Sequence, residues 1–143
     1  MKRYFFVVLA LLFGGIGLAQ ETGDLTIRID VVKNKGKGQL VFLLFDQEEG
    51  FPREADKAKY RAKIKKVVSK MSHTFTNIPY GEYAVCVFHD ENENGAIDTN
   101  FMGMPKEHVA ASNMTGMGRP SFKKCEINLG ESKMSVELDF IND

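Results

Sequence analysis

Apolar and polar residues alternate along much of this chain, and a period of two predicts a protein built from β-strands. The alternation is clearest from Leu25 to Val32 and from Met134 to Ile141, as expected for strands with one buried face. Two other runs, Gln39 to Phe45 and Glu82 to Phe88, are apolar at nearly every position. Such runs predict central strands that are covered on both faces.

The stretch from Glu54 to Val68 fits two local structures. Its apolar and basic residues alternate, which favours a strand, but its apolar residues also recur at helical spacing, and alanine and lysine favour helices. We predict a short helix or turn near Glu54 to Lys59, followed by a strand to about Val68.

Turn-forming residues separate the other predicted strands. Pro79-Tyr80-Gly81 follows a strand that includes His73 to Ile78, and Gly130-Glu131-Ser132 follows a strand from Phe122 to Leu129. The segment from Thr99 to Pro120 has no period and reads as a long loop, which in a compact domain is usually functional or disordered. About seven short strands and at most one short helix predict an all-β fold, an antiparallel β-sandwich.

The first residues have the three-part pattern of a secretory signal. Lys2 and Arg3 precede an apolar run from Tyr4 to Phe13, and small residues occupy positions 17 and 19. We predict a signal peptide over residues 1–19 and a single β-sandwich domain over residues 20–143, with an uncleaved anchor as the alternative. The expected location is periplasmic, secreted or at the cell surface, with no membrane span in the mature chain.

Charge narrows the expected partners. The chain has 19 basic and 19 acidic residues, and this balance is not typical of a protein that binds nucleic acid. The stretch from Lys57 to Lys70 is nevertheless basic throughout, which would suit an anionic glycan, lipid headgroups or a protein partner. Alternating lysines are also typical of the solvated face of an edge strand, and we favour that interpretation.

The only cysteines, Cys86 and Cys125, fall in predicted strands and are expected to face the core. Export would permit a disulfide between them, whereas two buried thiols acting as small apolar side chains is the alternative. The sequence leaves both open.

The segment from Asp90 to Asp98 has the spacing D-x-N-x-N-G-x-x-D. In calcium loops, alternate residues direct oxygen atoms at one ion, and a glycine permits the sharp bend. The pattern therefore predicts calcium as the cofactor of this loop. Its predicted ligands are Asp90, Asn92, Asn94, Asp98 and the backbone carbonyl of Ala96.

The loop departs from a helix-loop-helix calcium site at its twelfth position, where Phe101 replaces the bidentate glutamate. A closing carboxylate must come from elsewhere, and Glu107 is the nearest later candidate. With few carboxylates, the expected dissociation constant is on the order of 10⁻⁴–10⁻³ M, as in extracellular modules. The alternative is a turn without metal, since Asp and Asn side chains bond readily to their own backbone.

Other chemistry has weaker support. His73, His89 and His108 lack the short paired spacing of zinc ligands. A hydrolase could use a cluster of His89, Asp90 and Glu107, but Ser112 and Ser121 are not in a nucleophile-elbow sequence. A binding protein for a carbohydrate or another cell-envelope ligand could use the loops from Phe101 to Phe122, with Phe101, the methionines and Arg119 as contacts. We favour a non-enzymatic binding or structural module.

Three segments together resemble a bacterial exported family catalogued as domain of unknown function 2141. They are Asn77 to Val85, the H-D-x-N-x-N-G element at His89 to Gly95, and Asp98 to Glu107 with its G-x-P-x-E element. The resemblance implies a periplasmic or outer-surface sandwich, immunoglobulin-like or prealbumin-like, and it implies no activity. The family usually has small residues where Cys86 and Cys125 stand, so their joint presence implies a bond if their strands are neighbours.

Overall fold

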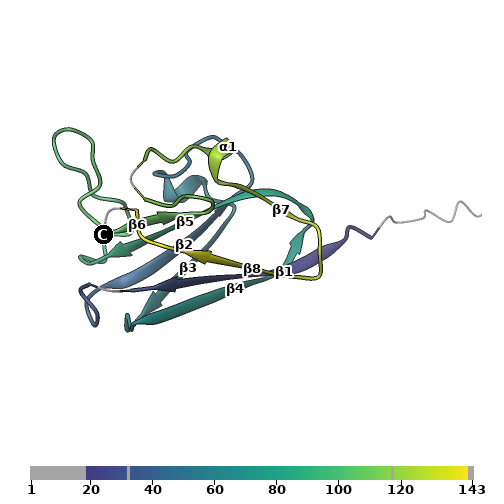
Figure 1. The fold of residues 1–143 in the computed structure, drawn as a ribbon, viewed down its shortest axis with the longest axis horizontal. Coiled ribbons are helices and arrows are strands. Elements are labelled where there is room, and N and C mark those ends of the chain that lie inside the picture. The colour runs from purple at the N-terminus through teal and green to yellow at the C-terminus, as the bar shows by residue number, and fades with distance from the viewer. Residues whose placement is uncertain (1–18, 32, 117, 142–143) are drawn as a thin grey trace, which may run out of the picture.

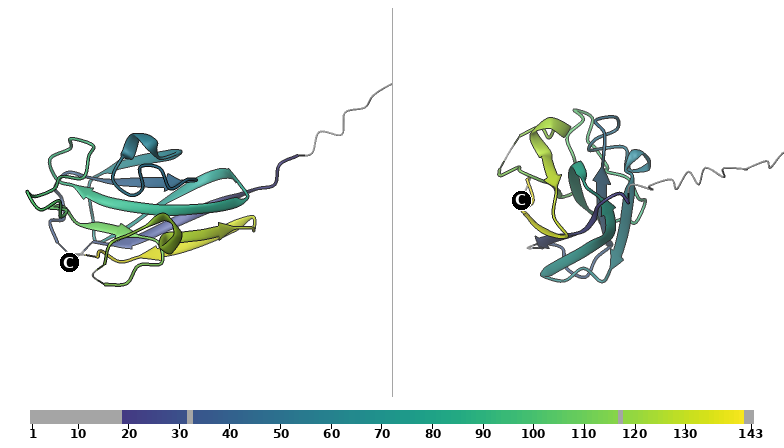
Figure 2. Two further views of the ribbon diagram at one scale, coloured as in Figure 1. Left: turned by 90° about the horizontal axis from the view of Figure 1, so that it is seen from above. Right: turned by 90° about the vertical axis from the view of Figure 1, so that its right-hand side faces the viewer.

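Two β-sheets pack face to face in the computed structural model, which describes residues 19–31, 33–116 and 118–141 (Figures 1 and 2). Except for Ala19, the predicted signal peptide lies outside these ranges. Both sheets and the whole described core lie between residues 22 and 141. No helix within the described residues is long and apolar enough to cross a membrane.

The smaller sheet has three strands in the order β4–β1–β8. The larger sheet has five strands: four follow the order β3–β2–β5–β6, and the fifth, β7, pairs with another part of β5. Strand pairing is antiparallel except between β1 and β8, which run parallel. The strands are β1 (Thr22–Asp30), β2 (Gln39–Phe45), β3 (Tyr60–Lys65), β4 (Lys70–Pro79), β5 (Gly81–Asp90), β6 (Val109–Ala111), β7 (Glu126–Leu129) and β8 (Lys133–Leu138). The predicted all-β sandwich is confirmed.

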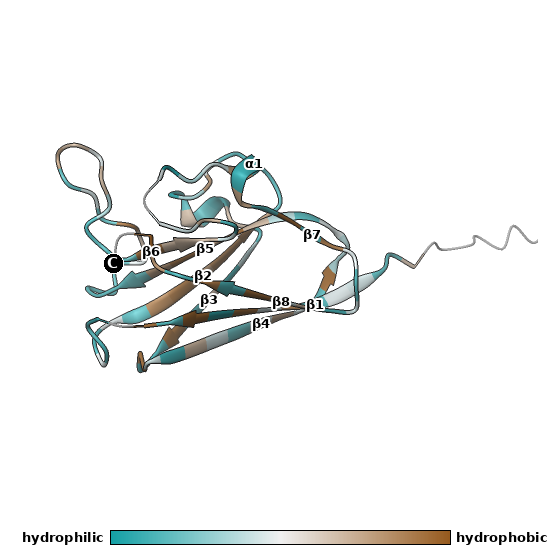
Figure 3. Ribbon diagram, in the orientation of Figure 1, coloured by the Kyte–Doolittle hydropathy of each residue, from teal (hydrophilic) through white to brown (hydrophobic). Residues whose placement is uncertain are grey.

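The main core lies between the two sheets. Alternate residues of β1, including Leu25, Ile27 and Ile29, point inward and meet Phe42 and Leu44 of β2. The other face of β2 and β5 is also covered, because the segment after β2 and the short helix α1 (Phe122–Cys125) pack on it. Every residue of β2 is therefore buried, and this strand is apolar along most of its length (Figure 3).

Two elements differ from the sequence-based prediction. The predicted strand from Phe122 begins as helix α1, because Phe122 and Cys125, three residues apart, both turn onto the outer face of the larger sheet. Strand β6, with three residues, lies inside the segment predicted as a loop, since three residues are too few to establish a period. The ambiguous stretch forms the 3-10 helix η1 (Ala55–Lys57) and then β3.

Cys125 therefore lies in α1 and not in a strand. Cys86 and Cys125 are both fully buried free thiols. Burial raises the pKa of each thiol above its ordinary value. The thiolate, which is the reactive form, is thus disfavoured at both positions.

The basic stretch from Lys57 to Lys70 contains β3, which is an edge of the larger sheet. Four of its seven basic side chains form ion pairs with acidic neighbours. The ion pairs are Lys57–Glu49, Lys59–Asp46, Lys65–Glu93 and Lys70–Asp30. This arrangement agrees with the interpretation of these lysines as protection of a sheet edge.

Candidate functional site

The loop that begins at Asp90 leaves the end of β5, and its first side chain is fully buried. One carboxylate oxygen of Asp90 accepts hydrogen bonds from Gln39 Nε2 at 2.8 Å and from the backbone N–H of Gly95 at 2.8 Å. The other accepts from the backbone N–H of Asn94 at 3.1 Å. A positive φ of 80° at Gly95 completes the bend around this carboxylate. Asp90 is therefore the structural centre of the turn.

The next three polar side chains of the motif converge on one another. Asn92 Nδ2 donates to Asp98 Oδ2 at 2.6 Å, and Asn94 Nδ2 donates to Asp98 Oδ1 at 3.1 Å. The carboxamide oxygens of Asn92 and Asn94 accept from the backbone N–H groups of Asn94 and Ala96, at 3.1 and 2.9 Å. The structure thus brings together the side chains at the third, fifth and ninth positions of the predicted calcium loop, whereas the first, Asp90, bonds to Gln39 and to backbone N–H groups.

Glu107 folds back onto this loop from the other end of the excursion. Only 6% of its surface is exposed, and its Oε2 accepts from the backbone N–H of Asp98 at 3.2 Å. Burial raises the pKa of Glu107 to about 7, and the charges of Asp90 and Asp98 act in the same direction, against hydrogen bonds from the backbone of Asp98 and Glu91. Glu107 lies at the loop, as predicted, but it contacts the backbone of Asp98.

In the presence of a chelator, we expect the contribution of Glu107 to the stability of the protein to fall as the pH rises from about 4.5 to about 7. The pKa of Glu107 is higher in the folded state, so its stabilising effect is complete below the unfolded value of 4.5 and is lost as pH rises through about 7. Glu107→Gln should remove on the order of 1–2 kcal/mol of this decline, because a pKa unit is worth about 1.4 kcal/mol and the loop is partly solvated.

Urea unfolding at several pH values measures this effect. Glu137→Gln, at an exposed position on β8, is the matched control and should follow the wild type. Parallel pH profiles of the wild type and Glu107→Gln would contradict the assignment.

Residues that are distant in sequence hold the loop in place. Asn34 Nδ2 donates to Glu91 Oε1 at 2.6 Å, and Lys65 Nζ pairs with Glu93 at 2.8 Å. Gly38 packs directly against the backbone of Asp90, with no room for a side chain. Sequence reasoning missed these residues and Gln39, because nothing local to them marks a contact with the loop. The only sequence feature that points to an unusual backbone there is the Gly-Lys-Gly turn just before β2.

Within the described ranges, no three histidine, cysteine, aspartate or glutamate side chains are grouped so that they could hold a metal ion. The predicted donors are instead a mixture of two carboxylates, two carboxamides and the backbone carbonyl of Ala96. Calcium accepts all three kinds of oxygen, whereas zinc prefers nitrogen and sulfur. These donor types are ones that calcium accepts. The side-chain oxygens of Asp90, Asn92 and Asn94, however, accept hydrogen bonds from backbone N–H groups, as in the alternative of a turn without metal.

The histidines do not form a site together. His89 is fully buried, with its Nε2 2.8 Å from the carbonyl oxygen of Lys37. His73 contacts the rings of Phe42 and Phe75, and burial lowers its pKa. His108 packs on Phe140. Neither zinc binding nor a hydrolase built on His89, Asp90 and Glu107 gains support from this arrangement.

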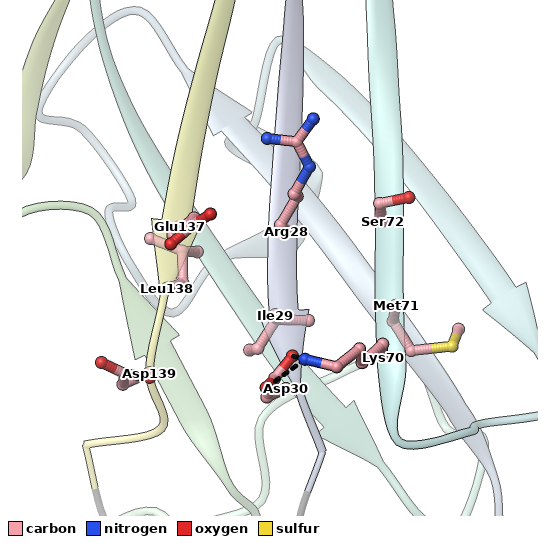
Figure 4. Close-up of a pocket in the computed structure, with 9 residues that line it drawn as sticks. All are labelled: Arg28, Ile29, Asp30, Lys70, Met71, Ser72, Glu137, Leu138 and Asp139. Carbon is pink, nitrogen blue, oxygen red and sulfur yellow. Dashed lines mark hydrogen bonds and ion pairs between the residues drawn. The ribbon is translucent and has the colours of Figure 1, made fainter.

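A shallow groove lies elsewhere, at one end of the smaller sheet (Figure 4). Its lining comes from β1, β4 and the end of β8, and it includes Arg28, Ser72 and Glu137. Asp30 and Lys70 pair across it at 3.0 Å. None of the predicted site residues lines it.

Comparison with curated proteins gives no match, and neither does comparison with solved structures. One family model matches residues 27–137, a range that runs from β1 to β8 and includes the whole Asp90–Glu107 loop. Its description is "Uncharacterized protein conserved in bacteria (DUF2141)". Since the match covers most of the chain, this protein belongs to the DUF2141 family of uncharacterized bacterial proteins.

Proposed function

We propose that this protein is an exported binding or structural module, not an enzyme, whose Asp90–Glu107 loop is stabilised by calcium. The observation that carries the proposal is the convergence of Asn92 and Asn94 on the carboxylate of Asp98, beside the buried Asp90. Export is supported by the signal pattern of residues 1–19.

The side chains of Asp90, Asn92, Asn94 and Asp98, with the carbonyl of Ala96, would hold the ion. Calcium would supply a positive charge that offsets the repulsion between closely spaced carboxylates. Asp98 now receives two carboxamide N–H groups, which are weak neutral partners for a charged group. Glu107 would lie over the same point from the second half of the loop, since it already reaches the backbone of Asp98.

The benefit to the protein is order in the segment that follows. Between Asp98 and Val109 the chain leaves the sandwich and returns, and it is held at its base by the bond from Lys106 N–H to the Asp98 carbonyl at 2.8 Å. An ion at the base would fix both ends of this excursion. The loop would then present a defined surface, and the surface rather than the ion would do the binding.

Millimolar calcium is expected to raise the melting temperature of residues 20–143 above its value in chelator. A dissociation constant on the order of 10⁻⁴–10⁻³ M corresponds to about 0.4–1.4 kcal/mol of added stability at about 1 mM calcium, or roughly 2–6 °C. Asp98→Asn keeps the shape of the side chain but removes its charge, and it should abolish most of the rise. Thermal melts followed by circular dichroism measure both effects.

Asp139→Asn is the matched control, since Asp139 is an exposed aspartate outside the loop. It should respond to calcium as the wild type does. Magnesium tests selectivity, because it demands a smaller and more regular octahedral site. A wild-type melting temperature that is the same in calcium and in chelator would refute the calcium proposal.

A further inference from the structure

The chain between Asp98 and Val109 projects from the sandwich, and its outermost part is an exposed apolar tip formed by Phe101, Met102 and Met104. Their surfaces are 97%, 65% and 55% exposed, and they are three of the four large apolar side chains that are exposed among the described residues. The tip belongs to the green loop that projects from the body at the left of Figure 1. Apolar side chains gathered on a projection mark a contact surface, because single exposed ones are normally scattered.

The tip is a tight, hydrogen-bonded hairpin. Thr99 and Pro105 are paired as a β-bridge at its base. The side-chain oxygen of Asn100 accepts from the backbone N–H groups of Met102 and Met104, at 2.9 and 3.0 Å. These bonds hold the apolar side chains outward in advance, so that little conformational entropy is lost when they are buried.

The backbone closes the same turn. Gly103 N–H donates to the Asn100 carbonyl, and Asn100 N–H donates to the Met104 carbonyl, both at 2.9 Å. Gly103 has a φ of 76° with open space around it, so the turn is free of the protein body on that side. A convex projection of this kind is suited to inserting into a target, not to enclosing a ligand.

Two basic residues lie next to the tip. Arg53 Nη2 donates to the carbonyl of Gly103 at 3.0 Å, which brings a guanidinium to the turn itself. Lys106 is exposed at the base of the hairpin, just after Pro105. An apolar end with cations behind it matches the layers of an anionic membrane, in which acyl chains lie beneath negative headgroups.

From this arrangement we infer that the tip formed by Phe101, Met102 and Met104 inserts into the surface of an anionic lipid membrane, with Arg53 and Lys106 on the headgroups. The inference depends on the proposed function only for export, which would place the module beside an envelope membrane. It does not require calcium. Three side chains give weak and reversible attachment, as for other shallow anchors.

Sedimentation of residues 20–143 with vesicles tests the inference. Vesicles rich in phosphatidylglycerol should bind the wild type, phosphatidylcholine vesicles should bind it less, and salt should weaken the binding. Phe101→Ser should reduce binding about tenfold, because it removes the largest buried apolar area. Met104→Ser should reduce it less, and the matched control Val68→Ser, at a side chain of equal 55% exposure, should bind as the wild type does.

A fluorescence measurement locates the tip directly. The chain has no tryptophan, so Phe101→Trp introduces a single reporter. Its emission should shift to the blue on anionic vesicles and be quenched by brominated acyl chains, whereas Glu131→Trp, at the exposed turn between β7 and β8, should do neither.

Each assay should be run in calcium and in chelator. Vesicle binding that persists in chelator supports membrane insertion of the tip even if the calcium proposal fails. A melting temperature that depends on calcium, without vesicle binding, refutes membrane insertion and leaves the calcium proposal standing. Equal binding by Phe101→Ser and Val68→Ser, or equal binding to both kinds of vesicle, would overturn the inference. So would capture of a protein through the tip with no binding to vesicles.

Discussion

Substituting Ala for Gly38 is expected to destabilise the protein by about 3 kcal/mol or more, because two backbone segments meet there without room for a methyl group. A Cβ atom at Gly38 would lie 2.2 Å from the backbone oxygen of Asp90 and 2.6 Å from the Cα of Glu91. These are backbone atoms, which cannot rotate away, so the start of the loop must shift. Urea unfolding measures the loss.

Gly36→Ala is the matched control for this substitution. Gly36 also has a positive φ, of 84°, but a Cβ atom there would meet nothing within 4 Å. It should therefore show only the backbone cost of a left-handed alanine, about 1–2 kcal/mol. If the two variants lose the same stability, the close approach of Gly38 to Asp90 is unimportant to the fold.

Asp90→Ala is expected to cost about 2–4 kcal/mol even in chelator, because each buried donor left without an acceptor costs about 1–3 kcal/mol. The substitution removes the acceptor of Gln39 Nε2 and of the backbone N–H of Gly95. The backbone N–H of Asn94 loses one of its two acceptors and keeps the side-chain oxygen of Asn92. Gln39 itself is only 4% exposed, so water cannot easily replace the carboxylate. Urea unfolding in chelator separates this structural role from any role in holding an ion.

Asp139→Ala, at an exposed aspartate, should change stability by no more than about 0.5 kcal/mol. Asp90→Asn should fall between the two, because a carboxamide keeps one acceptor oxygen but loses the charge. A loss below about 1 kcal/mol for Asp90→Ala would contradict the central role of this carboxylate in the turn.

The motif from Asp90 to Asp98 was readable because its contacts are local. Asx side chains bond to backbone groups two to five residues ahead, so spacing alone determines which atoms meet. The position of Glu107 was also anticipated, but its burial and raised pKa were not. Those depend on how the far end of a long excursion packs against the loop.

The sequence-based prediction differs most from the structure in the segments that follow the loop. Helix α1 replaces the start of a predicted strand, and this decision depends on the outer face of the larger sheet, against which Phe122 and Cys125 pack. The sequence offered Phe101 only as one contact of a possible ligand-binding loop, and the structure shows that its side chain is almost fully exposed. In both cases the deciding factor is a surface that other parts of the chain create.

The sequence by itself determined the sandwich and its longer strands, because alternation at a period of two is a property of each strand alone. It also determined that β2 and β5 are central, since both their faces are apolar, and that Asn92, Asn94 and Asp98 lie together. Only the tertiary structure decided that β8 runs parallel to β1 and that Gln39 and Gly38 meet Asp90 from another strand. Pairing partners are chosen by the burial that the whole chain achieves, and no single segment carries that information.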